Sequence, residues 1–146
     1  MLRIFQDWLQ NKLQTSQASE TSQDVATAVL LYEVMRADRD FNKQEQVVYR
    51  QQLQQHFSLS PDELTTLCEM SKSKAEGAVD YQHFTRVVND CCGPEQKRKI
   101  LDSLWAVAFS DHELSPDEEY TIRKIADLLY IPHSEFIQSK LAHQPG

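Results

Sequence analysis

The chain has 146 residues, a formal net charge of −7, 40% hydrophobic and 25% charged residues, and only 3 glycines and 5 prolines. This length is enough for one domain with its own core, and the scarcity of glycine and proline favours long helices over a turn-rich fold. The negative charge repels phosphate backbones and anionic lipid headgroups, so neither nucleic acid nor a membrane surface is expected as a main partner.

No stretch of sequence approaches the roughly 18 apolar residues that a membrane span needs. The opening segment MLRIFQDWLQ is too polar for the core of a secretion signal, so we expect a cytoplasmic protein with no membrane insertion. The three cysteines, Cys68, Cys91 and Cys92, lack the spacing of a zinc site, and adjacent cysteines rarely form a disulfide. We interpret all three as buried thiols.

The first 21 residues are predicted to form a segment of their own before the main domain, with a helix that packs onto that domain and does not act as a detachable arm. Apolar side chains recur at helical spacing over residues 2–13, whereas residues 15–23 are polar. We therefore expect an amphipathic N-terminal helix and a polar linker over residues 1–21, followed by one helical domain over residues 22–146.

Residues 22–146 contain only helical patterns, with no convincing strand. The segment Ser60-Pro61-Asp62-Glu63 and the segment Ser115-Pro116-Asp117-Glu118 both have the pattern of a capping box with proline at the first helical position. The expected helices cover residues 22–37 and 43–57, begin at 61, at 81 after an Asp80 cap, at 94 and at 116, and end with a short helix around 136–141. Core residues expected from their helical phase include Leu31, Phe84, Leu104, Trp105, Ile122, Ile125 and Tyr130, and also Trp8 of the N-terminal helix.

The domain carries an internal repeat. At an offset of 73, the segment from Leu31 to Asp38 matches the segment from Leu104 to Asp111, and Glu45 matches Glu118. Shortening the offset to 72 continues the match into the next helix. The repeat halves cover about residues 22–73 and 94–142, and we expect a compact all-α bundle of about seven to eight helices with pseudo-two-fold symmetry.

Two acidic segments resemble the paired A-D-G-x-[IL]-x-x-x-E segments of TerB-like bacterial domains: Ala37-Asp38-Arg39-Asp40-Phe41-Asn42-Lys43-Gln44-Glu45 and Asp111-His112-Glu113-Leu114-Ser115-Pro116-Asp117-Glu118. The resemblance covers roughly residues 22–142. It implies a compact bundle of about seven helices, acidic turns proposed to bind divalent cations, and a link to tellurite resistance or a stress-response complex. The family glycine after the aspartate is replaced by Arg39 and His112, which weakens the case for ligation by backbone atoms.

Each acidic turn offers carboxylates that a reversal between helices could aim at one point. Hard cations such as calcium, manganese or magnesium take six or more oxygen ligands, so waters or the two turns together must complete the shell. An ordinary EF-hand is excluded because Lys43 replaces its glycine and Tyr49 its last glutamate. The candidate metal ligands are Asp38, Asp40, Glu45, Asp111, Glu113 and Glu118.

Helix capping offers a second explanation of these acidic residues. Acidic side chains stabilise helix N-termini without any metal, although Asp38 and Asp111 precede the caps and need not be acidic for that purpose. The sequence contains no catalytic motif, so we expect a non-enzymatic module with a protein partner of unknown identity. Two functions stay open: a TerB-like divalent-cation binder sensitive to chelator, and a metal-independent adaptor with an acidic face.

Overall fold

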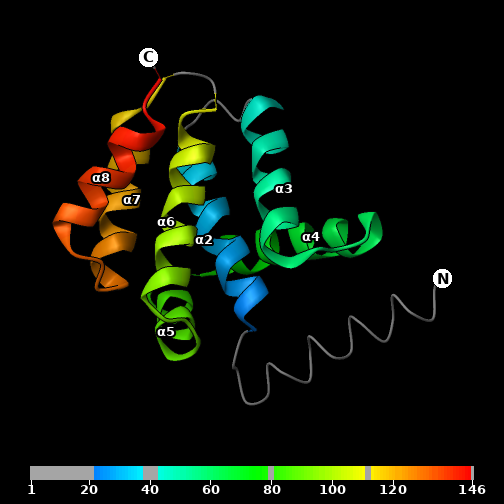
Figure 1. Ribbon diagram of the computed structural model, residues 1–146. Helices are drawn as coiled ribbons and strands as arrows, with labels where there is room; N and C mark the ends of the chain where they lie inside the picture. The colour runs from blue at the N-terminus through cyan, green and yellow to red at the C-terminus, as the bar shows by residue number, and fades with distance from the viewer. Residues whose placement is uncertain (1–21, 38–42, 79–80, 111–112, 146) are drawn as a thin grey trace.

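The described part of the chain folds into helices joined by short connections, with no strand among the described residues. The computed structural model describes residues 22–37, 43–78, 81–110 and 113–145. Its seven helices, labelled as in Figure 1, are α2 (Gln23–Ala37), α3 (Lys43–Phe57), α4 (Pro61–Gly77), α5 (Gln82–Cys91), α6 (Pro94–Ala108), α7 (Pro116–Leu128) and α8 (His133–His143). The prediction of an all-α bundle is confirmed. The predicted helix and linker at residues 1–21 lie outside the described residues.

Both predicted capping boxes are formed. In α4 the Glu63 amide donates to Ser60 Oγ over 3.2 Å, and the Ser60 amide donates to Glu63 Oε1 over 2.9 Å. In α7 the corresponding distances between Ser115 and Glu118 are 3.1 and 3.0 Å. The start of α5 differs from the prediction, because its cap position is Tyr81, which makes no side-chain capping bond.

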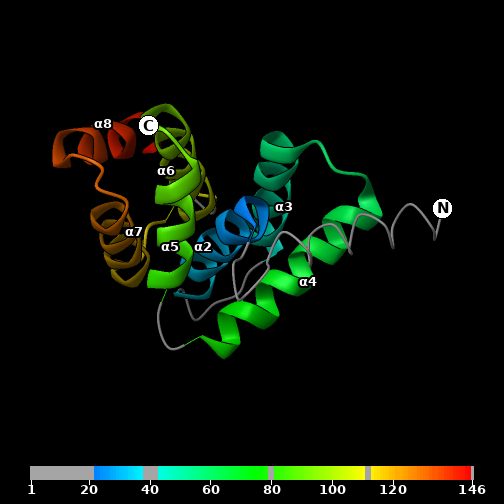
Figure 2. The same cartoon turned by 90° about the horizontal axis from the view of Figure 1, so that it is seen from below.

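Helix α2 is the centre of the bundle and contacts α3, α4, α5, α6 and α7. Figure 2 shows the other helices arranged around it. Its burial on almost every side follows from its sequence, since ten of its fifteen residues are buried and most of them are apolar. The predicted core residues Leu31, Phe84, Leu104, Trp105, Ile122 and Ile125 are all buried, which confirms them.

Two predictions of burial were wrong. Tyr130 is 80% exposed, because α7 ends at Leu128 and the helical period no longer applies at position 130. Cys91 is also exposed and Cys68 is half-buried, so only Cys92 of the three thiols is buried.

Helices α2 and α6 run in the same direction through the bundle. Gln23 at the start of α2, Gln96 at the start of α6 and Phe57 at the end of α3 line one cavity, so these three helix ends lie together. Figure 1 shows the opposite ends of α2 and α6, and the beginnings of α3 and α7, all at the top of the view. The helix ends that precede and follow the two acidic segments therefore lie at one end of the bundle.

A backbone feature recurs in the two halves. Ser58, directly after α3, has φ 50°, and Tyr130, after α7, has φ 60°; they are the non-glycine residues with positive φ among those described. They are 72 positions apart, the offset at which the sequence halves match after the acidic turns. The two ends of α3 and α7 thus agree with the repeat register, and superposition of the halves stays a prediction.

Within the described ranges, every helix is too short or too polar to cross a lipid bilayer.

Candidate cation site at the acidic turns

The described members of the predicted ligand set divide into two buried carboxylates and one exposed carboxylate. Glu45 and Glu118 are each 0% exposed, and Glu113 is exposed. Asp38, Asp40 and Asp111 lie outside the described residues. Within the described ranges no three histidine, cysteine or acidic side chains come together as a metal-binding group.

The two buried glutamates occupy the same place in their helices. Glu45 is the third residue of α3 and Glu118 the third residue of α7, so each follows an acidic turn at the same helical position. Their burial follows from helical phase, because Glu45 lies one turn before the buried Tyr49 and Glu118 one turn before the buried Ile122.

Capping alone does not account for this burial. Glu63 forms the same reciprocal capping box at the start of α4, and its side chain remains partly exposed in bonds that face solvent. An ionised carboxylate taken out of water costs several kcal/mol unless charge or hydrogen bonds compensate. Glu118 therefore needs more stabilisation from nearby charges or hydrogen bonds than Glu63 does, although the two capping boxes are otherwise alike.

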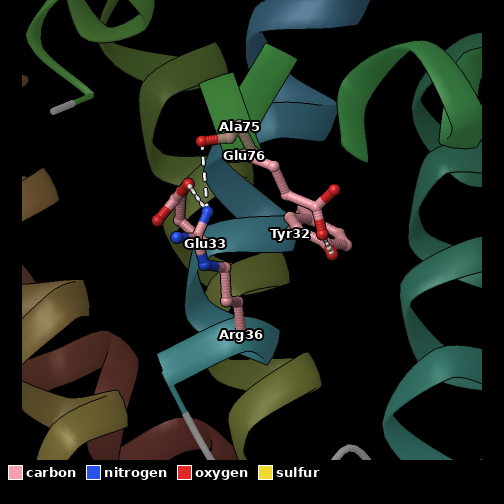
Figure 3. Close-up of polar contacts among 5 residues, drawn as sticks. All are labelled: Tyr32, Glu33, Arg36, Ala75 and Glu76. Carbon is pink, nitrogen blue, oxygen red and sulfur yellow. Dashed lines mark hydrogen bonds and ion pairs between the residues drawn. The ribbon is translucent and has the colours of Figure 1, made fainter. Parts of the chain in front are cut away.

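The first acidic turn follows a helix end that is fastened to α4. Figure 3 shows Arg36 reaching the end of α4, where its Nη1 donates to the Ala75 carbonyl oxygen over 3.1 Å and lies 3.6 Å from Glu33 Oε1. On the neighbouring side, Tyr32 Oη donates to Glu76 Oε2 over 3.3 Å. These contacts hold the last turn of α2 against the last turn of α4 and set where the chain leaves α2.

Burial also shifts the pKa values of Glu33 and Tyr32, which take part in these contacts. Loss of solvent raises the pKa of Glu33, and the Arg36 guanidinium acts in the opposite direction. The pKa of Tyr32 is also raised, first by burial and then by the adjacent Glu76 carboxylate. The polar contacts beside the first turn are thus partly shielded from water, where electrostatic interactions are stronger than at a fully exposed surface.

The second acidic turn follows a helix end that is held by aromatic packing. The Phe109 amide donates to the Trp105 carbonyl oxygen over 2.9 Å, and the two rings stack with centroids 5.7 Å apart. Ser110 Oγ donates to the Val107 carbonyl oxygen over 2.8 Å, which satisfies a carbonyl in the last turn of α6. Both acidic turns therefore leave from ordered helix ends, one fixed by Arg36 and the other by Trp105.

Two of the candidate oxygen ligands, Glu45 and Glu118, lie in the first turns of α3 and α7. The N-termini of α3 and α7 lie at one end of the bundle, and their positive dipole ends favour carboxylates close to them. Carboxylates that lie close together repel one another, and a hard divalent cation is the kind of ligand that removes such repulsion.

The burial of Glu45 and Glu118 was missed at the level of sequence, where both were treated as acidic turn residues. A signal was available, because Glu118 shares the helical stripe of Ile122, Ile125 and Leu129. The contact of Arg36 with Ala75 joins residues 39 positions apart, and neither residue belongs to a motif that would pair them.

Comparison with known proteins finds one matching family model. The family model described as "Tellurite resistance protein TerB" matches residues 24–141, which is most of the chain and includes both acidic turns and every described helix except the ends of α2 and α8. No curated protein and no solved structure matches the chain.

Proposed function

Since the chain belongs to the TerB family, we propose that it is a non-enzymatic module that binds a divalent cation through its two acidic turns. The observation that carries this proposal is the pair of completely buried glutamates, Glu45 and Glu118, at equivalent positions after the two turns. The comparison with Glu63 supports it, because the same capping box in α4 leaves its glutamate partly exposed.

Calcium, manganese or magnesium are the cations that suit such a site, because all three are bound by carboxylate oxygens in proteins. The first turn supplies Asp38, Asp40 and Glu45, and the second supplies Asp111, Glu113 and Glu118. One turn alone offers too few oxygens for a six-coordinate ion, and the position of the flanking helix ends at one end of the bundle supports joint ligation or completion by water.

In the cell, this module acts as a cytoplasmic component of a bacterial stress-response complex, with a protein as its partner. The description of the matching family supports tellurite resistance as the setting. The net charge of −7 supports a partner that is a protein and not a nucleic acid.

The test is a calorimetric titration of chelator-treated protein with calcium, manganese and magnesium, paired with thermal melting. Binding to the folded state alone raises its stability by about 2.7 kcal/mol at a hundredfold excess over Kd. In the double variant Asp38→Asn, Asp111→Asn, that gain should shrink, and the metal-free stability should hold or improve because two like charges are removed.

A matched control is the double variant Asp62→Asn, Asp90→Asn, which makes the same change in net charge at exposed positions on α4 and α5. It should keep the full response to cation. If the wild-type protein responds to none of the three cations beyond sodium at equal ionic strength, and the Asp38→Asn, Asp111→Asn variant is less stable without metal, the aspartates are structural acceptors. The metal-independent adaptor with an acidic face then replaces the cation-binding module.

A further inference from the structure

The end of α5 places two thiols side by side. Cys91 is the last residue of α5 and Cys92 its C-terminal cap, and their Sγ atoms are 3.6 Å apart. The Cys92 amide still donates to the Val88 carbonyl oxygen over 2.9 Å, whereas its own backbone is extended, with φ −123° and ψ 135°. Cys91 is exposed and Cys92 is 8% exposed, so a ligand from solvent reaches the pair from the Cys91 side.

The backbone geometry disfavours a disulfide between these two residues. Neighbouring Cα atoms are about 3.8 Å apart across a trans peptide, and disulfides usually join Cα atoms roughly 4.4–6.8 Å apart. A bond of about 2.05 Å would also require the sulfur atoms to move together by more than an ångström. Burial and the adjacent Cys91 raise the pKa of Cys92 to about 12, so this thiol remains protonated at neutral pH.

The separation of the sulfur atoms fits a single atom bound to both of them. If each thiolate bond is about 2.3 Å long and the angle between the bonds is near tetrahedral, the sulfur atoms are roughly 3.6–3.8 Å apart. An ion that binds two thiolates in a line would need a separation of roughly 4.6 Å with the same bond length. The thiols lie 3.6 Å apart, at which one S–H can donate to the other sulfur, and this separation matches the bent arrangement more closely than the linear one.

The number of available ligands also limits which element the two thiols can bind. No third histidine, cysteine or acidic residue joins the pair within the described ranges, and Cys68 lies on α4 beside Arg50 of α3. Structural zinc takes four protein ligands, so two thiols serve it poorly. Trivalent arsenic or antimony is soft, forms bent bonds to two sulfurs, and keeps a substituent of its own as its third neighbour.

We propose that Cys91 and Cys92 form a dithiol site for a trivalent metalloid. Phenylarsine oxide illustrates the reaction and its balance: two S–H bonds break, two As–S bonds form, and the oxide oxygen leaves as water with both protons. Arsenic remains trivalent and sulfur is not oxidised, so no oxidant or reductant takes part. This site lies at the junction of α5 and α6 and does not depend on the acidic turns.

The test uses the full chain, reduced with a phosphine that is then removed, and phenylarsine oxide as the probe. Intact-mass spectrometry counts the arsenical bound per chain, and competition with an excess monothiol measures how firmly it is held. The wild-type protein should retain one arsenical against the monothiol and release it to a small dithiol. Loss of either sulfur turns chelation into single attachment, so Cys91→Ser and Cys92→Ala should each weaken retention by roughly a hundredfold or more.

The matched control is Cys68→Ser, which removes the one cysteine outside the pair and should retain the arsenical as the wild-type protein does. Thermal melting of each variant checks that the fold is intact, and Cys91→Ser provides a variant at an exposed position if replacement of the buried Cys92 unfolds the chain. The proposal is overturned if the wild-type protein loses the arsenical to monothiol as easily as Cys91→Ser does, or if Cys68→Ser loses it to the same extent.

Discussion

Replacing Trp105 by alanine tests the centre of the second half of the bundle. The Trp105 side chain is completely buried and its ring lies 5.7 Å from the ring of Phe109 and 5.2 Å from that of Phe136, measured between centroids. Burial of an aromatic side chain removes roughly 150–250 Å² from water, which is worth roughly 4–6 kcal/mol at about 25 cal/mol per Å². Alanine keeps a small part of this area, so the expected cost is about 3–5 kcal/mol.

Urea unfolding followed by circular dichroism measures this cost, and thermal melting should show a decrease of roughly 10–20 °C. The indole Nε1 has no hydrogen-bond partner within the described residues, so Trp105→Phe sacrifices no hydrogen bond there and should cost clearly less than Trp105→Ala. Tyr130→Ala is the control, because this aromatic ring is 80% exposed and its loss should change stability by no more than about 0.5 kcal/mol. A Trp105→Ala protein that unfolds at the same urea concentration as the wild type would refute the reasoning.

Three further predictions concern a cap, a histidine and a helix end. Ser115→Ala should lower stability by about 1 kcal/mol because it removes the acceptor for the Glu118 amide, whereas Ser73→Ala on the exposed face of α4 should not; equal losses in urea unfolding would contradict this. Burial, and to a smaller extent Lys99, lowers the pKa of His56 in the folded chain. As the pH falls, His56 is therefore protonated in the unfolded chain before it is protonated in the folded chain, so stability should fall as pH drops below about 6.5. Urea unfolding above and below that pH should show a smaller loss in His56→Gln than in the wild type, and equal losses would exclude His56 as the cause. Tyr130→Gly should hold or raise the melting temperature, because glycine adopts the φ of 60° without the cost of roughly 1 kcal/mol that a side chain adds. A clear decrease in melting temperature would show that the tyrosine ring stabilises the fold by more than its backbone conformation costs.

The helices could be predicted because their signals are local. The apolar residues of α2 indicate a buried helix, and the Ser-Pro-Asp-Glu segments at the starts of α4 and α7 indicate helix N-termini. Each of these patterns is contained in a short stretch of sequence. Tyr130 shows the limit of this reasoning, because its phase continues that of α7 but the helix has already ended at Leu128. Pro132 shows that the helix must end before it but does not fix the last residue, and the position with positive φ holds tyrosine where glycine would be the usual signal.

The candidate site could be predicted only in part. The acidic residues and their duplication are visible in the sequence, but the burial of Glu45 and Glu118 depends on the helices packed over them. The proximity of Cys91 and Cys92 in sequence does not fix the distance between their sulfur atoms, which depends on where α5 ends. Both features arise from tertiary packing, and composition alone does not specify them.

The central position of α2 makes it a reporter for the whole molecule. Its amides are covered by five other helices, so they exchange with deuterium only when the bundle opens as a unit. Exchange of the α2 amides therefore measures the global free energy of unfolding, whereas the exposed side of α8 exchanges through local fraying. A ligand that binds only the folded chain slows exchange in α2 by the same factor whether it binds at the acidic turns or at the end of α5. Additional slowing confined to the first turns of α3 and α7, or to the junction of α5 and α6, then identifies which of the two sites the ligand occupies.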